Sequence, residues 1–179
     1  LVSNYQNTAL AFQIEDDFPI RINQETAFVY SFLPTEDLTG LGVIVNGDFS
    51  TDPSRKHLIY DIETNATIKI IAIQIITLIE KNLSSNKSEN IRIIKALIPY
   101  ADPRMIGFKK TSFEKLLLEQ IKNVNSDFFE NLMLPPNWMN TKDYNIIAKS
   151  NGNLVIEASF LDIDGLIPLL KYLGAKEAS

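Results

Sequence analysis

The sequence contains no cysteine and only one histidine, and it carries no excess of positive charge. Without cysteine the chain has neither a disulfide framework nor a thiolate metal site, and His57 alone cannot build a multi-histidine metal cluster. The net charge of −5 argues against non-specific attraction to nucleic acid or to an anionic membrane surface. We therefore expect no metal site, no nucleic-acid partner and a cytoplasmic protein.

Motifs of self-contained enzymes are also missing. The sequence has no G-x-x-x-x-G-K phosphate loop and no G-x-S-x-G nucleophile elbow, and no nucleophile–base pair accompanies the histidine. Asp162–Gly165 begins like a calcium loop, but Pro168 and Leu169 follow where ligands would be needed, so this segment is interpreted as a turn and helix cap. We expect the isolated chain not to be an enzyme, and a self-contained hydrolase is the weakest alternative.

Long hydrophobic runs are scarce as well. The most apolar run, Ile68–Ile79, contains Lys69 and Gln74 and is shorter than a membrane span. We therefore expect no membrane partner. The chain begins at Leu1 rather than at methionine, and we expect it to be a piece of a longer protein.

The sequence does have the composition of a globular domain, with 179 residues of which 45% are hydrophobic and 22% are charged. Segments rich in β-branched and aromatic residues, separated by short turns, predict a mostly antiparallel N-terminal sheet of about three strands. These segments are Ala9–Glu15, Ala27–Pro34 and Gly42–Phe49. Helical patterns follow them, so the predicted fold class is α+β.

A long helix is predicted after residue 51. Asp52 suits an N-cap and Pro53 suits the first helical position. Asp61 and Glu63 either cap a second helical segment or mark a bend in one long helix. Ile62–Leu83 is apolar on almost every side, which indicates a helix buried in the core.

Two further helices are predicted in the middle of the chain. Residues 91–100 form a short amphipathic pattern that ends before Pro99. Thr111 and Glu114 have the spacing of a capping box, which predicts that a helix over 111–124 begins there. These helices would pack with the long helix against the sheet.

The last third of the chain predicts a small α/β unit. Asn151-Gly152 lies between two apolar segments and is typical of a β-hairpin. Residues 162–179 predict a closing helix with Pro168 in its first turns. Because proline, asparagine and tryptophan cluster before this unit, we predict one domain over residues 1–134 and an appendage over residues 135–179.

Ser54 and Arg55 stand in the first turn of the helix predicted at residue 52. A helix N-terminus offers free N–H groups and a partial positive charge, and the guanidinium fork of arginine suits phosphate. The pattern therefore predicts an anion contact made by Arg55 with Ser54 beside it. A capped helix whose surface arginine pairs with a carboxylate is the plainer alternative and stays open.

Four short elements follow one another between residues 28 and 58. They are Phe32-Leu33-Pro34, Thr39-Gly40-Leu41, Asn46-Gly47 with Phe49, and Ser54-Arg55. In this order they resemble a stretch of sacsin and its bacterial relatives, which follows a GHKL-type ATPase domain similar to that of the ninety-kilodalton heat-shock chaperones. The resemblance implies a middle-type domain in a multidomain, chaperone-like ATP-binding protein.

The resemblance also implies a role for Arg55. The middle domain of those chaperones directs an arginine at the γ-phosphate held by the preceding domain, and Arg55, with Ser54 beside it, occupies that position here. Asp52 stands where the chaperones have asparagine, and Ile59 stands where they have a glutamine that makes a second phosphate contact. ATP and Mg²⁺ would be bound only by the upstream N-terminal ATPase domain, whose acidic-Asn helix and D-x-G-x-G loop are absent from this sequence.

A second interpretation is an interaction or client-binding scaffold with no nucleotide role. Trp138 with Met133, Leu134 and Met139 forms a candidate anchor cluster for a protein partner, and the same residues are also suited to covering the core. Self-association into a homodimer is compatible with either interpretation.

Overall fold

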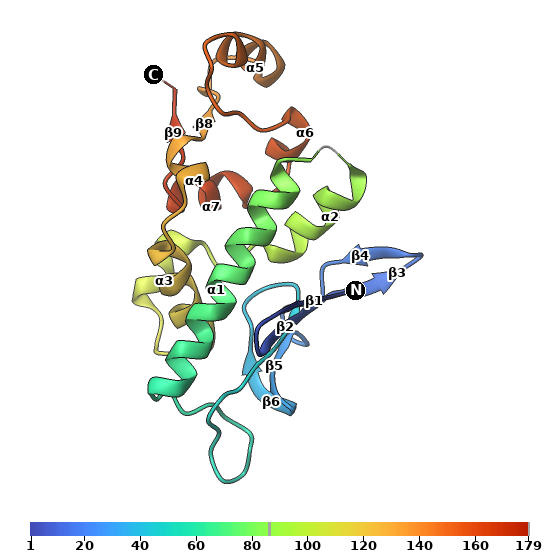
Figure 1. Cartoon of the computed structure of the whole chain (residues 1–179), viewed down its shortest axis with the longest axis vertical. Helices are drawn as coiled ribbons and strands as arrows, with labels where there is room; N and C mark the ends of the chain where they lie inside the picture. Colours follow the sequence, from blue (N-terminus) through green and yellow to red (C-terminus); the bar gives the residue numbers. More distant parts are fainter. Residues whose placement is uncertain (86, 179) are drawn as a thin grey trace.

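The computed structural model describes residues 1–85 and 87–178, and its fold class is α+β, as predicted. A five-stranded sheet lies on one side of a long central helix, and shorter helices pack around the rest of that helix (Figure 1). The strands of this sheet are β1 (Val2–Tyr5), β2 (Thr8–Ala11), β5 (Phe28–Ser31), β6 (Leu33–Leu38) and β7 (Ile44–Asn46). A separate two-stranded hairpin is made of β3 (Gln13–Glu15) and β4 (Phe18–Ile20).

The sheet has the strand order β1-β2-β7-β5-β6. All neighbours are antiparallel except β5 and β7, which run parallel with Val29 opposite Val45. The prediction of a mostly antiparallel sheet is thus confirmed in part, because the β5–β7 pair is parallel, and the expected number of strands was too low. The strand β6 was missed because its sequence, LPTEDL, has the composition of a turn, and an edge strand tolerates the proline.

The central helix, α1, spans Ile62–Leu83, and Asp61 is its N-cap. The Asp61 carboxylate accepts a hydrogen bond from the backbone N–H of Thr64 at 2.9 Å. The prediction that a helix begins at Asp52-Pro53 is therefore wrong, and the alternative in which Asp61 caps the helical segment is confirmed. The prediction that this helix is buried is also confirmed, since one row of its isoleucines is 0–1% exposed, namely Ile68, Ile71, Ile75 and Ile79.

By length and hydropathy alone, α1 is the one helix among residues 1–85 and 87–178 that could cross a membrane. The apolar run noted in the sequence is the middle of this 22-residue helix. Half of its most apolar window is buried inside the protein, and core helices of this kind pass the same test. The apolar character of α1 is thus accounted for by its place between the sheet and the other helices.

The remaining helices are short. They are α2 (Ser88–Leu97), the 3₁₀ helix η1 (Pro103–Phe108), α3 (Phe113–Asn123), α4 (Asp127–Asn131), α5 (Thr141–Ser150), α6 (Ala158–Leu161) and α7 (Leu166–Tyr172). Both α2 and α3 pack against α1. The predicted helix over 111–124 is confirmed, but its N-cap is Ser112, which accepts from the N–H of Lys115. The capping box between Thr111 and Glu114 is wrong because Glu114 instead forms an ion pair with Lys109.

The predicted hairpin around Asn151-Gly152 is also wrong, because residues 141–150 form α5. Gly152 has a φ of +77° and lies directly after the C-cap of that helix. Its N–H donates to the carbonyl of Lys149, and the N–H of Asn153 donates to the carbonyl of Ala148, which together close a Schellman motif. The Asn-Gly pair thus serves a helix end rather than a strand turn, since both require a left-handed glycine.

The C-terminal part joins the same core as the sheet. Two short parallel strands, β8 (Met133–Leu134) and β9 (Lys176–Glu177), pair with each other and bring the last residues of the chain beside the segment that follows α4. The closing helix is confirmed as α7, with Gly165 (φ +79°) at its start and Pro168 in its first turn. Phe160 and Leu166 belong to the buried cluster that includes α1. The division into residues 1–134 and 135–179 stays a prediction, and Ser179 lies outside the described residues.

Candidate functional site

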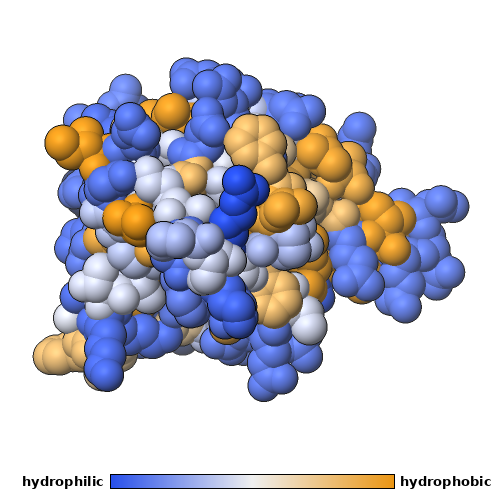
Figure 2. Space-filling model, turned by 90° about the horizontal axis from the view of Figure 1, so that it is seen from below, coloured by the Kyte–Doolittle hydropathy of each residue, from blue (hydrophilic) through white to orange (hydrophobic). Residues whose placement is uncertain are grey.

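Arg55 lies on a hairpin-like loop of residues 50–59, here called the Arg55 loop, between β7 and α1. The backbone N–H of Ile59 donates to the carbonyl of Ser50 at 2.8 Å, and the N–H of Asp52 donates to the carbonyl of His57 at 2.9 Å. Thr51 and Leu58 form an antiparallel bridge between the two arms of the loop. The loop projects at the lower end of the molecule in Figure 1, beyond the start of α1, and the view from below in Figure 2 shows this end, where hydrophilic side chains lie among hydrophobic ones. The arginine is therefore carried by a loop and not by a helix N-terminus.

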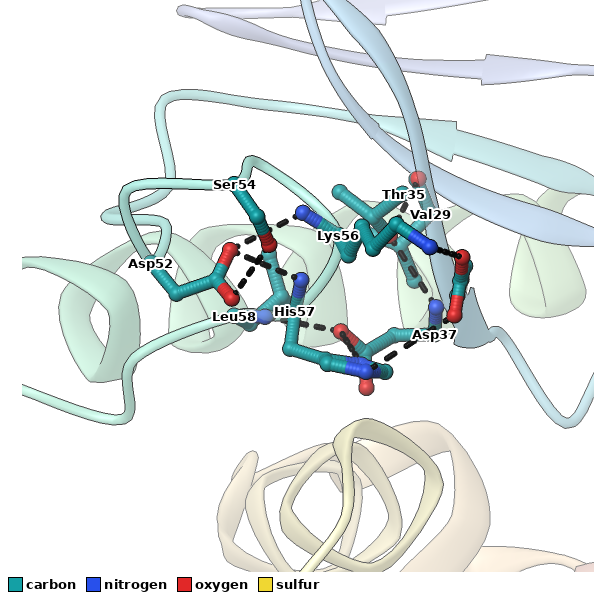
Figure 3. A network of polar contacts seen from close by, with 9 residues as sticks. Val29, Thr35, Asp37, Asp52, Ser54, Lys56, His57 and Leu58 are labelled. Carbon is teal, nitrogen blue, oxygen red and sulfur yellow. Dashed lines mark hydrogen bonds and ion pairs between the residues drawn. The ribbon is translucent and has the colours of Figure 1, made fainter.

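Asp52 explains why this stretch looked like a helix start. Its Oδ1 accepts the backbone N–H groups of Lys56 and His57, at 2.9 and 3.3 Å, and its Oδ2 accepts the hydroxyl of Ser54 at 2.7 Å (Figure 3). The Ser54 hydrogen bond is the main reason why the pKa of Asp52 is lowered from its usual value. Asp52 does cap free N–H groups, but they belong to a tight loop. The helix-dipole argument for anion binding at Arg55 is thus wrong, because α1 begins only at Ile62.

Arg55 occupies the tip of the loop in an uncommon backbone conformation. Its φ is +59°, in the left-handed region that residues with a Cβ atom rarely adopt. The side chain is exposed, and its guanidinium has no hydrogen bond or ion pair with any residue in the ranges 1–85 and 87–178. The carboxylate partner expected in the plainer alternative is therefore not seen within these ranges.

Two acidic residues of β6, Glu36 and Asp37, hold the second arm of the loop, and Figure 3 shows Asp37 beside Leu58 and His57. The N–H of Glu36 donates to the carbonyl of Lys56 at 2.6 Å, and the Lys56 ammonium lies 2.8 Å from the Glu36 carboxylate. The N–H of Leu58 donates to the carboxylate of Asp37 at 2.7 Å. The hydrogen bond with Lys56 is the main cause that lowers the pKa of Glu36, and the same bond raises the pKa of Lys56.

His57 lies between the same two carboxylates. Its imidazole nitrogens are 3.8 Å from Glu36 and 3.7 Å from Asp37. Sequence reasoning missed both acidic residues, because they lie in a segment expected to be a turn. The only signal in the sequence was charge complementarity between an acidic pair and the basic Lys56-His57 pair.

The base of the loop is fixed on α1 and α3. The hydroxyl of Thr67 donates to the carbonyl of Asp48 at 2.8 Å, and the hydroxyl of Thr64 accepts the N–H of Ser50 at 3.0 Å. Phe49 packs edge-on against Phe113, with ring centroids 5.7 Å apart. The tip of the Arg55 loop is thus carried on a base that is hydrogen-bonded to the core helix and packed into the hydrophobic core.

The other predicted site residues have different environments. Ser54 lies beside Arg55, but its hydroxyl hydrogen is donated to Asp52. Ile59 is 47% exposed and offers no polar group for a second phosphate contact. In the candidate anchor cluster, Trp138 is 73% exposed whereas Leu134 is 1% exposed, so the structure does not present these residues as one surface.

A cavity of about 640 Å³ lies elsewhere, between residues 98–103 and residues 161–168. Arg21 lines it, but this arginine is engaged within the protein. Its guanidinium carbon lies 3.8 Å from the centre of the Tyr100 ring, and its Nη2 donates to the carbonyl of Ile98. Arg21 is thus a structural arginine at the cavity, whereas Arg55 is exposed to solvent.

Within residues 1–85 and 87–178, no three histidine or acidic side chains are grouped so that they could hold a metal ion. Comparisons of the chain with protein-family models, with curated proteins and with solved structures gave no match. We therefore base the function on the geometry of the Arg55 loop and on the residues between 28 and 58 that resemble the sacsin-like family.

Proposed function

We propose that this chain is the region that follows the ATPase domain of a sacsin-like, GHKL-type ATP-binding protein. In this function the chain is not an enzyme by itself. It supplies Arg55 to the γ-phosphate of ATP, while ATP and Mg²⁺ are held by the upstream domain. Arginine in such a position stabilises the negative charge on the oxygens of the transferred phosphoryl group.

The proposal rests on one observation, namely that Arg55 is the one side chain at the tip of the loop that is not bound or buried within the described part of the protein. From residue 54 to residue 58, every side chain except that of Arg55 is engaged within the protein. Ser54 is bound to Asp52, the two basic residues after Arg55 face Glu36 and Asp37, and Leu58 is buried. An exposed, positively charged guanidinium on a loop held in place by hydrogen bonds is suited to contact a phosphate that another domain holds.

The order of elements supports the same function. A strand, β7, leads into the Arg55 loop, and the long helix α1 follows it. The resemblance implies a strand that leads into an arginine turn and then a long helix, and the order of these elements agrees with it, although Ser54 and Arg55 do not themselves open the helix. Because α1 starts after the loop, Arg55 is carried by a hairpin-like loop, and the helix dipole does not contribute to its attraction for an anion.

The test uses the full-length protein that carries the ATP-binding domain. We expect Arg55→Gln to lower the rate of ATP turnover by about 10²-fold or more and to leave nucleotide binding unchanged. Lys56→Gln is the matched control, because it removes one positive charge from the adjacent residue, whose ammonium is bound to Glu36. Equal turnover in the wild-type protein and the Arg55→Gln variant would overturn the proposal.

A second candidate function, a protein-interaction scaffold, is favoured by the exposure of Trp138. Tryptophan is enriched among residues that anchor protein interfaces, and 73% exposure leaves most of this side chain available. The experiment is to measure capture of candidate client proteins and the unfolding midpoint for Trp138→Ala. Loss of capture at an unchanged midpoint would support the scaffold, and unchanged capture would contradict it.

A further inference from the structure

We propose that Asp52 is a positioning residue for Arg55, one that holds the tip of the Arg55 loop so that the guanidinium is presented away from the fold. This inference rests on the proposed function, in which Arg55 contacts a phosphate held by another domain. It adds a specific residue to that function, because nothing in the resemblance assigns a role to an aspartate at this position.

The contacts of Asp52 reach both sides of the arginine. Its carboxylate accepts the hydroxyl of Ser54, the residue before Arg55, and the N–H of Lys56, the residue after it. Its main-chain carbonyl accepts the N–H of Arg55 itself at 2.9 Å. One residue therefore fixes the arginine backbone and both of its neighbours.

The backbone conformation of Arg55 makes such support necessary. A φ of +59° brings the Cβ atom close to the backbone, and a residue with a side chain keeps this conformation only where its surroundings impose it. If the hydrogen bonds to Asp52 are lost, the loop relaxes toward negative φ and the guanidinium samples other directions. The fraction of molecules with a correctly placed arginine then falls, which lowers the rate of reaction without weakening nucleotide binding.

Electrostatics alone predicts the opposite effect. Asp52 is a negative charge close to Arg55, and its removal would strengthen the attraction of this loop for an anionic phosphate. A positioning role predicts slower turnover when the carboxylate is removed, whereas a purely electrostatic role predicts equal or faster turnover. The sign of the change thus separates the two roles.

The supporting hydrogen bonds are tested on this chain by amide hydrogen exchange. In Asp52→Ala, we expect the N–H groups of Lys56 and His57 to lose protection, since both donate to the Asp52 carboxylate. Asp52→Asn keeps an acceptor oxygen and should retain part of the protection. Unchanged exchange in Asp52→Ala would overturn the inference.

The consequence is tested in the full-length protein by a double-mutant cycle. We expect Asp52→Ala to lower kcat by about 10-fold to 100-fold with unchanged nucleotide affinity, Asp52→Asn to lower it less, and neither to lower it further in an Arg55→Gln background. Asp48→Asn, an exposed aspartate before the loop, is the control for the loss of charge.

The outcomes distinguish this inference from the proposed function. If Arg55→Gln slows turnover but Asp52→Ala does not, or slows it equally in both backgrounds, the positioning role is wrong and the proposed function stands. If Arg55→Gln leaves turnover unchanged, the proposed function fails and the positioning role fails with it.

Discussion

Glu36 and Lys56 are joined twice, once through the backbone and once through their side chains. The N–H of Glu36 donates to the carbonyl of Lys56 at 2.6 Å, and the ammonium of Lys56 lies 2.8 Å from the carboxylate of Glu36. The first bond joins backbone atoms, so it attaches the Arg55 loop to the edge strand β6 whatever side chain stands at position 56. The second bond pairs the lysine with a carboxylate, whereas the adjacent Arg55 is exposed and has no ion pair among the described residues.

We therefore expect Lys56→Gln to have little effect on stability. Both side chains of the ion pair are more than half exposed, at 61% and 55%, where solvent and salt screen the attraction. The backbone bond remains in the variant and keeps the loop attached. The measurement is the urea midpoint of unfolding at low and at high salt, and a large drop in the midpoint would contradict this expectation.

Acidification should weaken the start of α1 through Asp61. A hydrogen bond from the Ser50 hydroxyl, followed by one from the N–H of Thr64, lowers the pKa of Asp61 from 3.8. Because the pKa of the folded state lies below that of the unfolded chain, the stabilisation by this carboxylate is complete above about pH 5, decreases as the pH approaches 3.8 and is lost as the pH falls through the lower pKa of the folded state. Asp61→Asn keeps a capping oxygen that does not titrate. We expect the unfolding midpoint of the wild-type protein to fall more steeply below about pH 5 than that of the variant, and equal slopes would argue against this role.

Gln74 is a buried polar group whose replacement should be costly. It is 3% exposed, donates to the carbonyl of Ser3 at 2.7 Å and accepts the hydroxyl of Thr8 at 3.0 Å. Gln74→Leu leaves the carbonyl of Ser3 without this donor and should lower the free energy of unfolding by about 1–3 kcal/mol. The Thr8 hydroxyl keeps its hydrogen bond of 2.7 Å to the carbonyl of Tyr5, so the loss comes mainly from the Ser3 side. Denaturant unfolding of the variant measures this, and an unchanged free energy of unfolding would contradict it.

Phe113 connects the core to the base of the Arg55 loop. It is 1% exposed and packs edge-on against Phe49. Phe113→Ala should cost about 3–5 kcal/mol because it leaves a cavity in the core. It should also increase amide exchange at Ser50, which follows Phe49. Unchanged exchange at Ser50 in a folded variant would show that α3 does not support the loop.

Trp138 is the only tryptophan of the chain and should report on its own exposure. At 73% exposure its fluorescence should resemble that of tryptophan in water and be quenched readily by acrylamide. Trp138→Ala should change the free energy of unfolding, measured with urea, by no more than about 0.5 kcal/mol, as is usual for surface substitutions. A shielded emission spectrum of the free protein would mean that this residue is buried.

Much of the helical part of the fold was predictable because apolar periodicity is strong there. The isoleucines of α1 and the pattern of α3 indicated buried and amphipathic helices directly. The strand β6 was not predictable, since its pairing with β5 outweighs a composition that favours a turn. Asn151-Gly152 was misassigned because a left-handed glycine suits a hairpin and a helix end equally well.

The candidate site was predictable in its residues but not in its conformation. Asp52 and Asp61 have equal capping propensity, and only the contacts of α1 with the loop base decide which of them begins the helix. Arginine gives no sequence signal for a left-handed backbone, as glycine or asparagine would. The attachment to Glu36 joins residues twenty positions apart, which no local pattern reveals.

The place of β7 has a consequence for the order of folding. It lies between the β1–β2 pair and the β5–β6 pair, although it is made after both of them. As the chain leaves the ribosome, the two pairs can form early from local contacts, but the sheet cannot close until residues 44–46 emerge and insert. The strand that completes the sheet leads directly into the Arg55 loop. We therefore expect the arginine to reach its final place only in the last step of sheet assembly.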